Sequence, residues 1–164
     1  MTPALPATAH ALELKHAYRL LNTGASILIS AAQGGRRDVM ACAWNMSLDF
    51  SPAKVAVCLD KATFTRELIE ASGSFAIGVP CVAQADLVFT VGSISGRELP
   101  GQDKFAAFGI AHHAATMIDA PLVAGCIGWL ECRLLPEPHL QQAHDLFIGE
   151  AVAAWVDERA FEGG

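Results

Sequence analysis

The sequence predicts a mainly β protein, an antiparallel barrel with a few inserted helices. Its 164 residues are enough for one well-buried core and too few for two ordinary domains. Short runs rich in β-branched residues recur along the chain, and no strand–helix–strand unit repeats. We therefore expect a single domain over residues 1–164, in which the Ala/Pro-rich residues 1–10 form a loosely held arm.

Six segments are predicted to form strands. The first two flank Gly34 and Gly35, which can adopt the positive φ of a hairpin turn. Between the second and third strands, Asn45–Pro52 is rich in side chains that hydrogen-bond the local backbone, so we expect a loop there. The predicted strands are Ser26–Ser30, Val39–Trp44, Lys54–Leu59, Phe75–Val79, Trp129–Leu134 and His144–Trp155.

Three helical segments are predicted between these strands. The first follows Thr63 and Thr65, which are candidate capping residues; apolar residues recur at helical spacing from Leu68, and Gly73 comes after the last of them. A second helix is expected within residues 83–91, and a helical turn within residues 103–108.

Charge and hydropathy argue against several classes of partner. The formal net charge is −6 and no basic run exceeds the pair Arg36–Arg37, so a nucleic-acid partner is not expected. The longest uncharged apolar stretch, Ala120–Leu130, is about half the length of a membrane span. Because 52% of the residues are apolar, we expect part of the apolar surface to be buried in a homodimer.

The cysteines and histidines indicate the redox environment of the protein and whether it binds a metal. The five cysteines are odd in number and widely spaced, which indicates reduced thiols in a cytoplasmic protein, and the N-terminal residues do not resemble a signal peptide. The histidines lack the paired spacing of a zinc site, so we predict no metal. The cysteines are Cys42, Cys58, Cys81, Cys126 and Cys132.

The segment Asp60–Arg66 gathers hydroxyls, an ammonium and a guanidinium where a helix begins. The free N–H groups and the dipole of a helix start favour an anion there. Lys61 adds a point charge and Arg66 a two-pronged donor suited to phosphate. The alternative is that the threonines only cap the helix while Lys61 and Arg66 are solvated.

A second informative segment, Cys42–Pro52, is where a strand leads into a polar loop shortly before the anion site. Exposed backbone there can recognise the polar edge of a flat ring, and Asn45 and Ser47 can bind a sugar-like chain. The alternative is a plain connection between two strands.

Together these segments resemble the flavin reductase-like family of FMN-binding split barrels, which includes flavoredoxin-type proteins. The order and spacing of several pieces carry the resemblance, which covers nearly the whole chain. The pieces are Asn45–Val57, Asp60–Gly73, Val91–Arg97, Asp103–Ala106 and His144–Glu150.

The resemblance implies a homodimer of Greek-key antiparallel barrels with FMN at the subunit boundary. It places the backbone of Cys42, Ala43, Trp44 and Asn45 against the isoalloxazine ring, and Ser47, Leu48, Asp49 and Phe50 at the ring edge and ribityl chain. It places Asp60, Lys61, Phe64, Thr65 and Arg66 at the phosphate end, and His144 beside the nicotinamide or the ring as the candidate catalytic residue.

The implied function is an FMN-dependent oxidoreductase. Hydride passes from NAD(P)H to FMN, and electrons leave to free flavin or to an acceptor protein, as in a flavin reductase or a flavoredoxin-like carrier. The alternative is a non-catalytic barrel that binds FMN or another phosphorylated ring such as pyridoxal phosphate.

Overall fold

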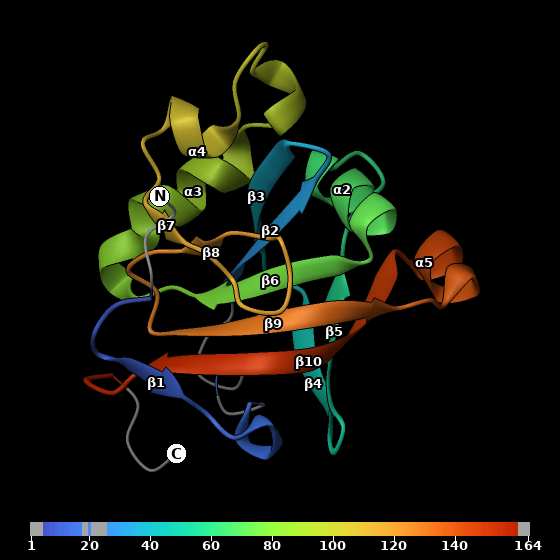
Figure 1. Ribbon diagram of the computed structural model, residues 1–164. Coiled ribbons are helices and arrows are strands. Elements are labelled where there is room, and N and C mark those ends of the chain that lie inside the picture. Colours follow the sequence, from blue (N-terminus) through green and yellow to red (C-terminus); the bar gives the residue numbers. More distant parts are fainter. Residues whose placement is uncertain (1–4, 18–19, 21–25, 161–164) are drawn as a thin grey trace.

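The computed structural model describes residues 5–17, 20 and 26–160. Within these residues one antiparallel sheet of eight strands has the order β3-β2-β6-β9-β10-β5-β4, and β1 adds to β10 (Figure 1). A second, two-stranded sheet pairs β7 with β8. The strands are β1 (Ala9–Ala11), β2 (Ile27–Gln33), β3 (Arg36–Cys42), β4 (Asn45–Phe50), β5 (Ala53–Cys58), β6 (Ser74–Val79), β7 (His112–His113), β8 (Leu122–Val123), β9 (Gly128–Leu135) and β10 (Leu146–Asp157).

Short helices surround this sheet. Helix α2 packs on β2 and β3, α3 and α4 pack on β3, and α5 leads into β10 at the other end of the sheet. None of the helices in the described residues is long and apolar enough to cross a membrane. The helices are α2 (Phe64–Ser72), α3 (Ala85–Ser93), α4 (Lys104–Ala107) and α5 (Pro138–His144), with 3₁₀ turns η1 (Leu14–His16), η2 (Val82–Gln84) and η3 (Gly96–Glu98).

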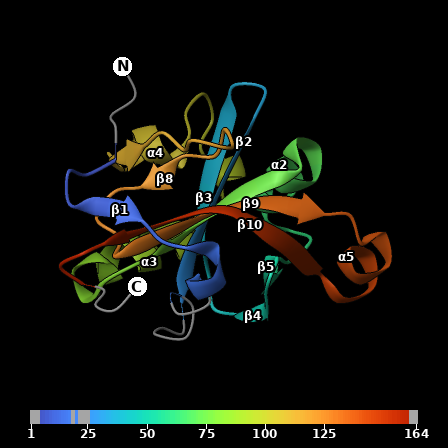
Figure 2. The same cartoon turned by 60° about the horizontal axis from the view of Figure 1, so that its bottom comes forward.

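The sheet curls because its two edge strands are neighbours in sequence. Strands β3 and β4 lie at opposite ends of the strand order, yet only Ala43 and Trp44 separate them. The N–H of Cys58 donates to the carbonyl of Trp44 at 2.9 Å, which ties this connection to β5. Figure 2 shows the resulting twist, with β2 and β10 at a steep angle to each other.

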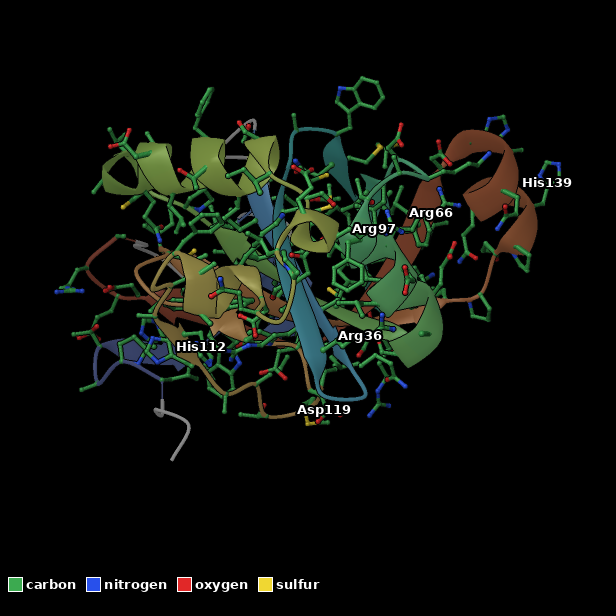
Figure 3. The ribbon with its side chains drawn as sticks, turned by 90° about the horizontal axis from the view of Figure 1, so that it is seen from above. Arg36, Arg66, Arg97, His112, Asp119 and His139 are labelled. Carbon is green, nitrogen blue, oxygen red and sulfur yellow. The ribbon has the colours of Figure 1, made fainter. Side chains whose placement is uncertain are left out.

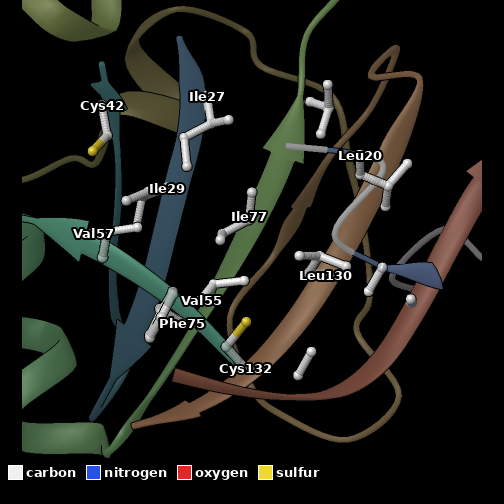
Figure 4. Close-up of a cluster of buried hydrophobic side chains, with 14 of the residues drawn as sticks. Leu20, Ile27, Ile29, Cys42, Val55, Val57, Phe75, Ile77, Leu130 and Cys132 are labelled. Atoms are coloured by element: carbon white, nitrogen blue, oxygen red, sulfur yellow. The ribbon is translucent and has the colours of Figure 1, made fainter. Parts of the chain in front are cut away.

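Apolar side chains fill both faces of the central strands. Inside the curl, Ile27 and Ile29 of β2 pack with Phe75 and Leu130 (Figure 4). On the other face, Leu28 of the same strand packs with residues of α3, α4 and the segment around β8. Because both faces are covered, consecutive residues of β2 from Ile27 to Ala31 are all buried, and this part of the strand lacks the polar face of a surface strand.

Most predicted elements are confirmed. The first hairpin joins β2 and β3 through Gly34 and Gly35, whose φ values are 58° and 78°. Helix α2 begins after Thr63 and ends at Gly73, which adopts the left-handed conformation with φ 70°. The helix predicted within residues 83–91 is α3, and the helical turn after Asp103 is α4.

The prediction of a loop over Asn45–Pro52 is wrong, because residues 45–50 form strand β4. The strand pairs with β5 from Asn45 opposite Val57 to Phe50 opposite Ala53, with an irregularity between Ser47 and Asp49. Ser51 and Pro52 alone make the turn, so pairing with the neighbouring strand overrides the turn preference of the side chains.

The last predicted strand begins too early, since His144 is the final residue of helix α5. Pro138 occupies the start of this helix, where its missing N–H costs nothing. Asp145 then adopts φ 54° and ends the helix, and β10 starts at Leu146.

The beginning of the chain also differs from the prediction of a loose arm. Ala9 and His10 belong to β1, which pairs with Asp157 and Val156 of β10. Residues 1–4 lie outside the described part of the chain.

Candidate functional site

Two adjoining cavities lie beside the second half of β3, and together we call them the main groove. Their volumes are about 330 Å³ and 360 Å³. They share Met40, Ala41 and Asp60, so they form one elongated depression along the end of β3. The first cavity, the helix half, borders the start of α2; the second, the loop half, borders Cys42–Trp44.

The helix half offers backbone donors to an anion. Thr63, Phe64 and Thr65 line it, and the segment Ser93–Ser95 forms the facing wall. Within the described residues, no side chain caps the first turn of α2 at its N-cap, Thr63. The N–H groups of that turn and the positive end of the helix dipole are therefore directed at this cavity.

The threonine hydroxyls do not cap α2, contrary to the sequence prediction. Thr63 Oγ1 donates to the carbonyl of Asp60 at 2.8 Å, and Thr65 Oγ1 donates to Asp38 Oδ2 at 2.7 Å. Asp60 Oδ1 accepts from the N–H of Ala62 at 2.7 Å and shapes the turn that enters the helix. Both hydroxyls are used inside the protein, and the backbone of the first turn is left for a ligand.

A buried ion pair lies beneath the helix half. Asp38 Oδ1 is 3.5 Å from Lys104 Nζ, and this ammonium also donates to the carbonyls of Val39 at 2.7 Å and Val91 at 2.9 Å. Burial raises the pKa of the Asp38 carboxyl and lowers the pKa of Lys104. The contacts join β3, α3 and α4 to Thr65 of α2, so the base of this cavity is rigid.

The loop half has fewer charged side chains: Asp60 and Asp145 line it, and Asp145 is paired with Arg66. Cys42, Ala43 and Trp44 line one wall, and Cys58 and His144 line the other. Burial raises the pKa of the Cys42 thiol to about 11, so this sulfur is uncharged at neutral pH. Trp44 is 76% exposed, and its indole stands at the rim of the cavity. A flat apolar ring suits this half better than an ion does.

Arg66 is buried and holds helix α5 rather than facing the groove (Figure 3). Its guanidinium donates to the carbonyl of Leu59 at 3.0 Å, to the carbonyl of Gln141 at 2.9 Å and to the carboxylate of Asp145. Its Nε donates to Glu70 at 3.0 Å. Donors that the sequence suggested for a phosphate are therefore bound to protein acceptors, and they fix the end of α5 that carries His144.

The structure brings only part of the predicted site together. Within the described residues, seven predicted positions line the main groove and seven line neither cavity. Lys61 belongs to the second group, because its ammonium donates to the carbonyl of Gln142 at 2.8 Å. In the groove are Cys42, Ala43, Trp44, Asp60, Phe64, Thr65 and His144; outside it are Asn45, Ser47, Leu48, Asp49, Phe50, Lys61 and Arg66.

Sequence reasoning missed several groove residues. Met40 and Ala41 lie at the junction of the two cavities, and Ser93–Ser95 closes the helix half. Arg97 follows in η3 and reaches the start of α2, where it donates to the carbonyl of Ala62. The available signal was Val91–Arg97, a segment that carries the family resemblance although no role was assigned to it.

Comparisons with known proteins agree with this geometry. Residues 18–163 match the family described as "Flavin reductase like domain". The chain is 45% identical to the uncharacterized protein YddH of Escherichia coli (strain K12), over 93% of this chain and 81% of that protein.

Several solved structures are similar to this fold. The crystal structure of an FMN-binding domain of a flavin reductases-like enzyme from Shewanella baltica OS155 has a TM-score of 0.89 and 47% identity, covering 94% of this chain and 80% of that one. Flavoredoxin of Desulfovibrio vulgaris (Miyazaki F) has a TM-score of 0.71 and 30% identity, covering 82% of this chain and 69% of that one.

The chain therefore belongs to the flavin reductase-like family. Its fold is the FMN-binding split barrel, an antiparallel sheet with a few helices, as the sequence predicts. FMN, the predicted cofactor, is confirmed at the level of the family, since it is the flavin named for the Shewanella domain.

We predict that Arg66→Gln lowers the free energy of unfolding by about 2–4 kcal/mol, because Asp145 and the carbonyls of Leu59 and Gln141 lose a buried cationic donor. Urea unfolding followed by circular dichroism measures the change. Lys61→Gln is the control: its side chain is 61% exposed, and its removal should cost less than about 1 kcal/mol. Equal losses in the two variants would contradict the role given to Arg66.

Proposed function

We propose that the protein binds FMN in the main groove and works as an NAD(P)H-dependent flavin oxidoreductase. The observation that carries the proposal is the continuity of the groove, from the uncapped start of α2 to the weakly charged loop half beside Trp44. A phosphate suits the first end and a flat ring the second.

The residues present fit FMN at both ends of the groove. The first turn of α2, from Phe64 to Thr65, would hold the phosphate through backbone N–H groups, with Arg97 near the same turn. Asp60 shapes the entry turn, and the backbone of Cys42, Ala43 and Trp44 would face the ring. When bound, FMN supplies the redox chemistry, accepting hydride from NAD(P)H and releasing electrons to free flavin or an acceptor protein.

His144 is the proposed catalytic residue of this arrangement. It lines the loop half at the end of α5, which Arg66 and Lys61 hold by donating to the carbonyls of Gln141 and Gln142. An imidazole there can guide a nicotinamide or a proton to the ring. Arg66 and Lys61 are positioning residues in this proposal, since both act through α5.

A homodimer would complete the groove in our proposal. The edge strand β4 exposes Met46, Leu48 and Phe50, and Trp44 stands beside them at the rim of the groove. Such a row of apolar side chains on an edge strand is typical of an interface. The polar residues of β4 that lie outside the groove, Asn45, Ser47 and Asp49, remain proposed cofactor contacts. The free cysteines suit a cytoplasmic location, which is part of the same proposal.

We expect the purified protein to be yellow, or to bind added FMN with a shift of its visible absorption bands. Native mass spectrometry after gentle purification identifies the ligand by its mass. A colourless protein that ignores FMN would overturn the proposal, and the mass of pyridoxal phosphate would favour the alternative of a non-catalytic barrel.

Replacing His144 with alanine should slow the bleaching of bound flavin by NADH or NADPH about fivefold, because the nicotinamide loses a guiding side chain. Stopped-flow absorbance measures the rate. The matched control is His139→Ala, on the same helix with its ring 6.1 Å from that of His144 and outside the groove lining. Unchanged rates in both variants would remove His144 from the site. If dithionite reduces the bound flavin but neither NADH nor NADPH does, an electron carrier is the better account.

The paired change Met46→Asp and Phe50→Asp should convert the dimer into monomers, because two charges would enter an apolar interface. Size-exclusion chromatography with light scattering measures the mass. Phe89→Asp is the control, since Phe89 is also a large exposed apolar residue but lies on α3. A wild-type protein that is monomeric at micromolar concentration would refute the proposed dimer.

A further inference from the structure

Two cysteines, Cys81 and Cys126, lie where β6 ends beside the start of β9, and we call them the thiol pair. Val79, the last residue of β6, is the register partner of Gly128, the first residue of β9 (Figure 1). Cys81 follows the first strand by two residues, and Cys126 precedes the second strand by two. The pairing of these strands therefore brings two thiols that are far apart in the sequence to the same end of the sheet.

The sulfur of Cys81 contacts the peptide unit that carries Cys126. Its Sγ donates to the carbonyl oxygen of Gly125 at 3.8 Å. That oxygen and the Cα of Cys126 belong to one planar peptide unit and lie on the same side of its trans bond. The sulfur of Cys81 is therefore a single peptide unit away from Cys126, so a change of side-chain rotamer can bring the two sulfurs to bonding distance.

The side chain of Gln84 contacts both members of the thiol pair. Its Oε1 accepts from the N–H of Cys81 at 3.3 Å, and its Nε2 donates to the carbonyl of Ala124 at 2.9 Å. The Gln84 side chain also hydrogen-bonds the Cys126 thiol. One amide thus holds the two segments together before any covalent bond forms between them.

The two thiols differ in their exposure to solvent. Cys81 is partly exposed and precedes Val82, which is 93% exposed. Cys126 is buried, and a Cβ at Gly78 would lie 2.9 Å from its Sγ, so the sulfur occupies space that only glycine leaves open. Burial raises the pKa of the Cys126 thiol to about 12, so this sulfur is uncharged at neutral pH. An oxidant in solution therefore meets Cys81 first.

We propose that Cys81 is an oxidation site for hydrogen peroxide and that Cys126 then forms a reversible disulfide with it. The Cys81 thiolate attacks one peroxide oxygen: an S–O bond forms, the O–O bond breaks, and the leaving hydroxide takes up the proton that Cys81 had released. The Cys126 sulfur next attacks the sulfenic acid: an S–S bond forms, the S–O bond breaks, and the leaving hydroxide takes the Cys126 proton. Two thiols are oxidised, and one peroxide is reduced to two molecules of water.

The disulfide would close the segment that carries one wall of the main groove. Between the two cysteines lie α3, α4 and the residues Ser93–Ser95, which line the helix half. A bond at the base of this segment turns it into a covalent loop. Disulfides of cytosolic proteins are usually transient and redox-sensing, so a reversible bond suits the proposed location. The inference needs no flavin and goes beyond the proposed function, so either can fail without the other.

Hydrogen peroxide treatment of the purified protein, followed by intact mass spectrometry, tests this inference. The wild-type protein should lose two hydrogens, a fall of about 2 Da. Its five free thiols should decrease by two. Peptide mapping should find Cys81 joined to Cys126, and dithiothreitol should restore the starting mass.

Three variants test the separate roles of the two thiols. Cys126→Ala should leave the Cys81 sulfenic acid without a partner, so its labelling by dimedone should rise about tenfold over the wild type. Cys81→Ser should abolish the loss of 2 Da, because the thiol that meets the peroxide is gone. Cys58→Ser is the matched control: Cys58 is also partly exposed but lies at the end of β5, and this variant should form the disulfide as the wild type does.

The result with the wild-type protein decides the inference even if a variant does not fold. A treated protein that keeps all its free thiols would refute the thiol pair. A linked peptide that joins Cys42 to Cys58, or that joins two protein chains, would refute it as well. Oxidation of Cys81 to a sulfinic acid while Cys126 stays free would show that the two sulfurs do not meet, and the proposed disulfide would be wrong.

Discussion

Ala43 and Trp44 connect the two edge strands of the main sheet, and this short connection constrains the rest of the fold. Strands β3 and β4 stand at opposite ends of the strand order, so the sheet must curl until they nearly meet. The hydrogen bond from the N–H of Cys58 to the carbonyl of Trp44 fixes the place where the sheet closes, and the main groove lies along this closure. The site is thus a consequence of how the sheet closes.

Charged groups near the main groove are largely neutralised by partners within the protein. Arg66 is paired with Asp145 and Glu70, and Lys104 with Asp38, so these ions stabilise α5 and the base of the groove. What remains for an anionic ligand is the backbone at the start of α2. In the same region, the exposed side chains of Arg36 and Arg97 both donate to the carboxylate of Glu67. Polarity in the groove therefore comes from backbone geometry more than from free cations.

Local patterns predicted most of the elements but not all of their roles. Gly34, Gly35 and Gly73 were reliable signals because positive φ is a local requirement that few other residues meet. The segment from Asn45 was predicted wrongly as a loop, because the backbone of these turn-favouring residues pairs with β5 in the sheet. Glu131 is a second residue that the local pattern does not explain. It lies in a strand of alternating polar and apolar residues, yet it is buried and its carboxylate accepts hydrogen bonds from Thr116, Met117 and Trp155.

The sequence by itself determined the fold class and the place along the chain where a flavin is proposed to bind, because turn glycines, β-rich runs and a helix start are local features. Only the tertiary structure decided which polar groups are free. Arg66 lies beside the helix start in sequence, but the folded chain brings Gln141 and Asp145 to it from about eighty residues away. Arg97 and Arg36 converge on Phe64 in the same way, because long-range packing assigns each side chain its partner.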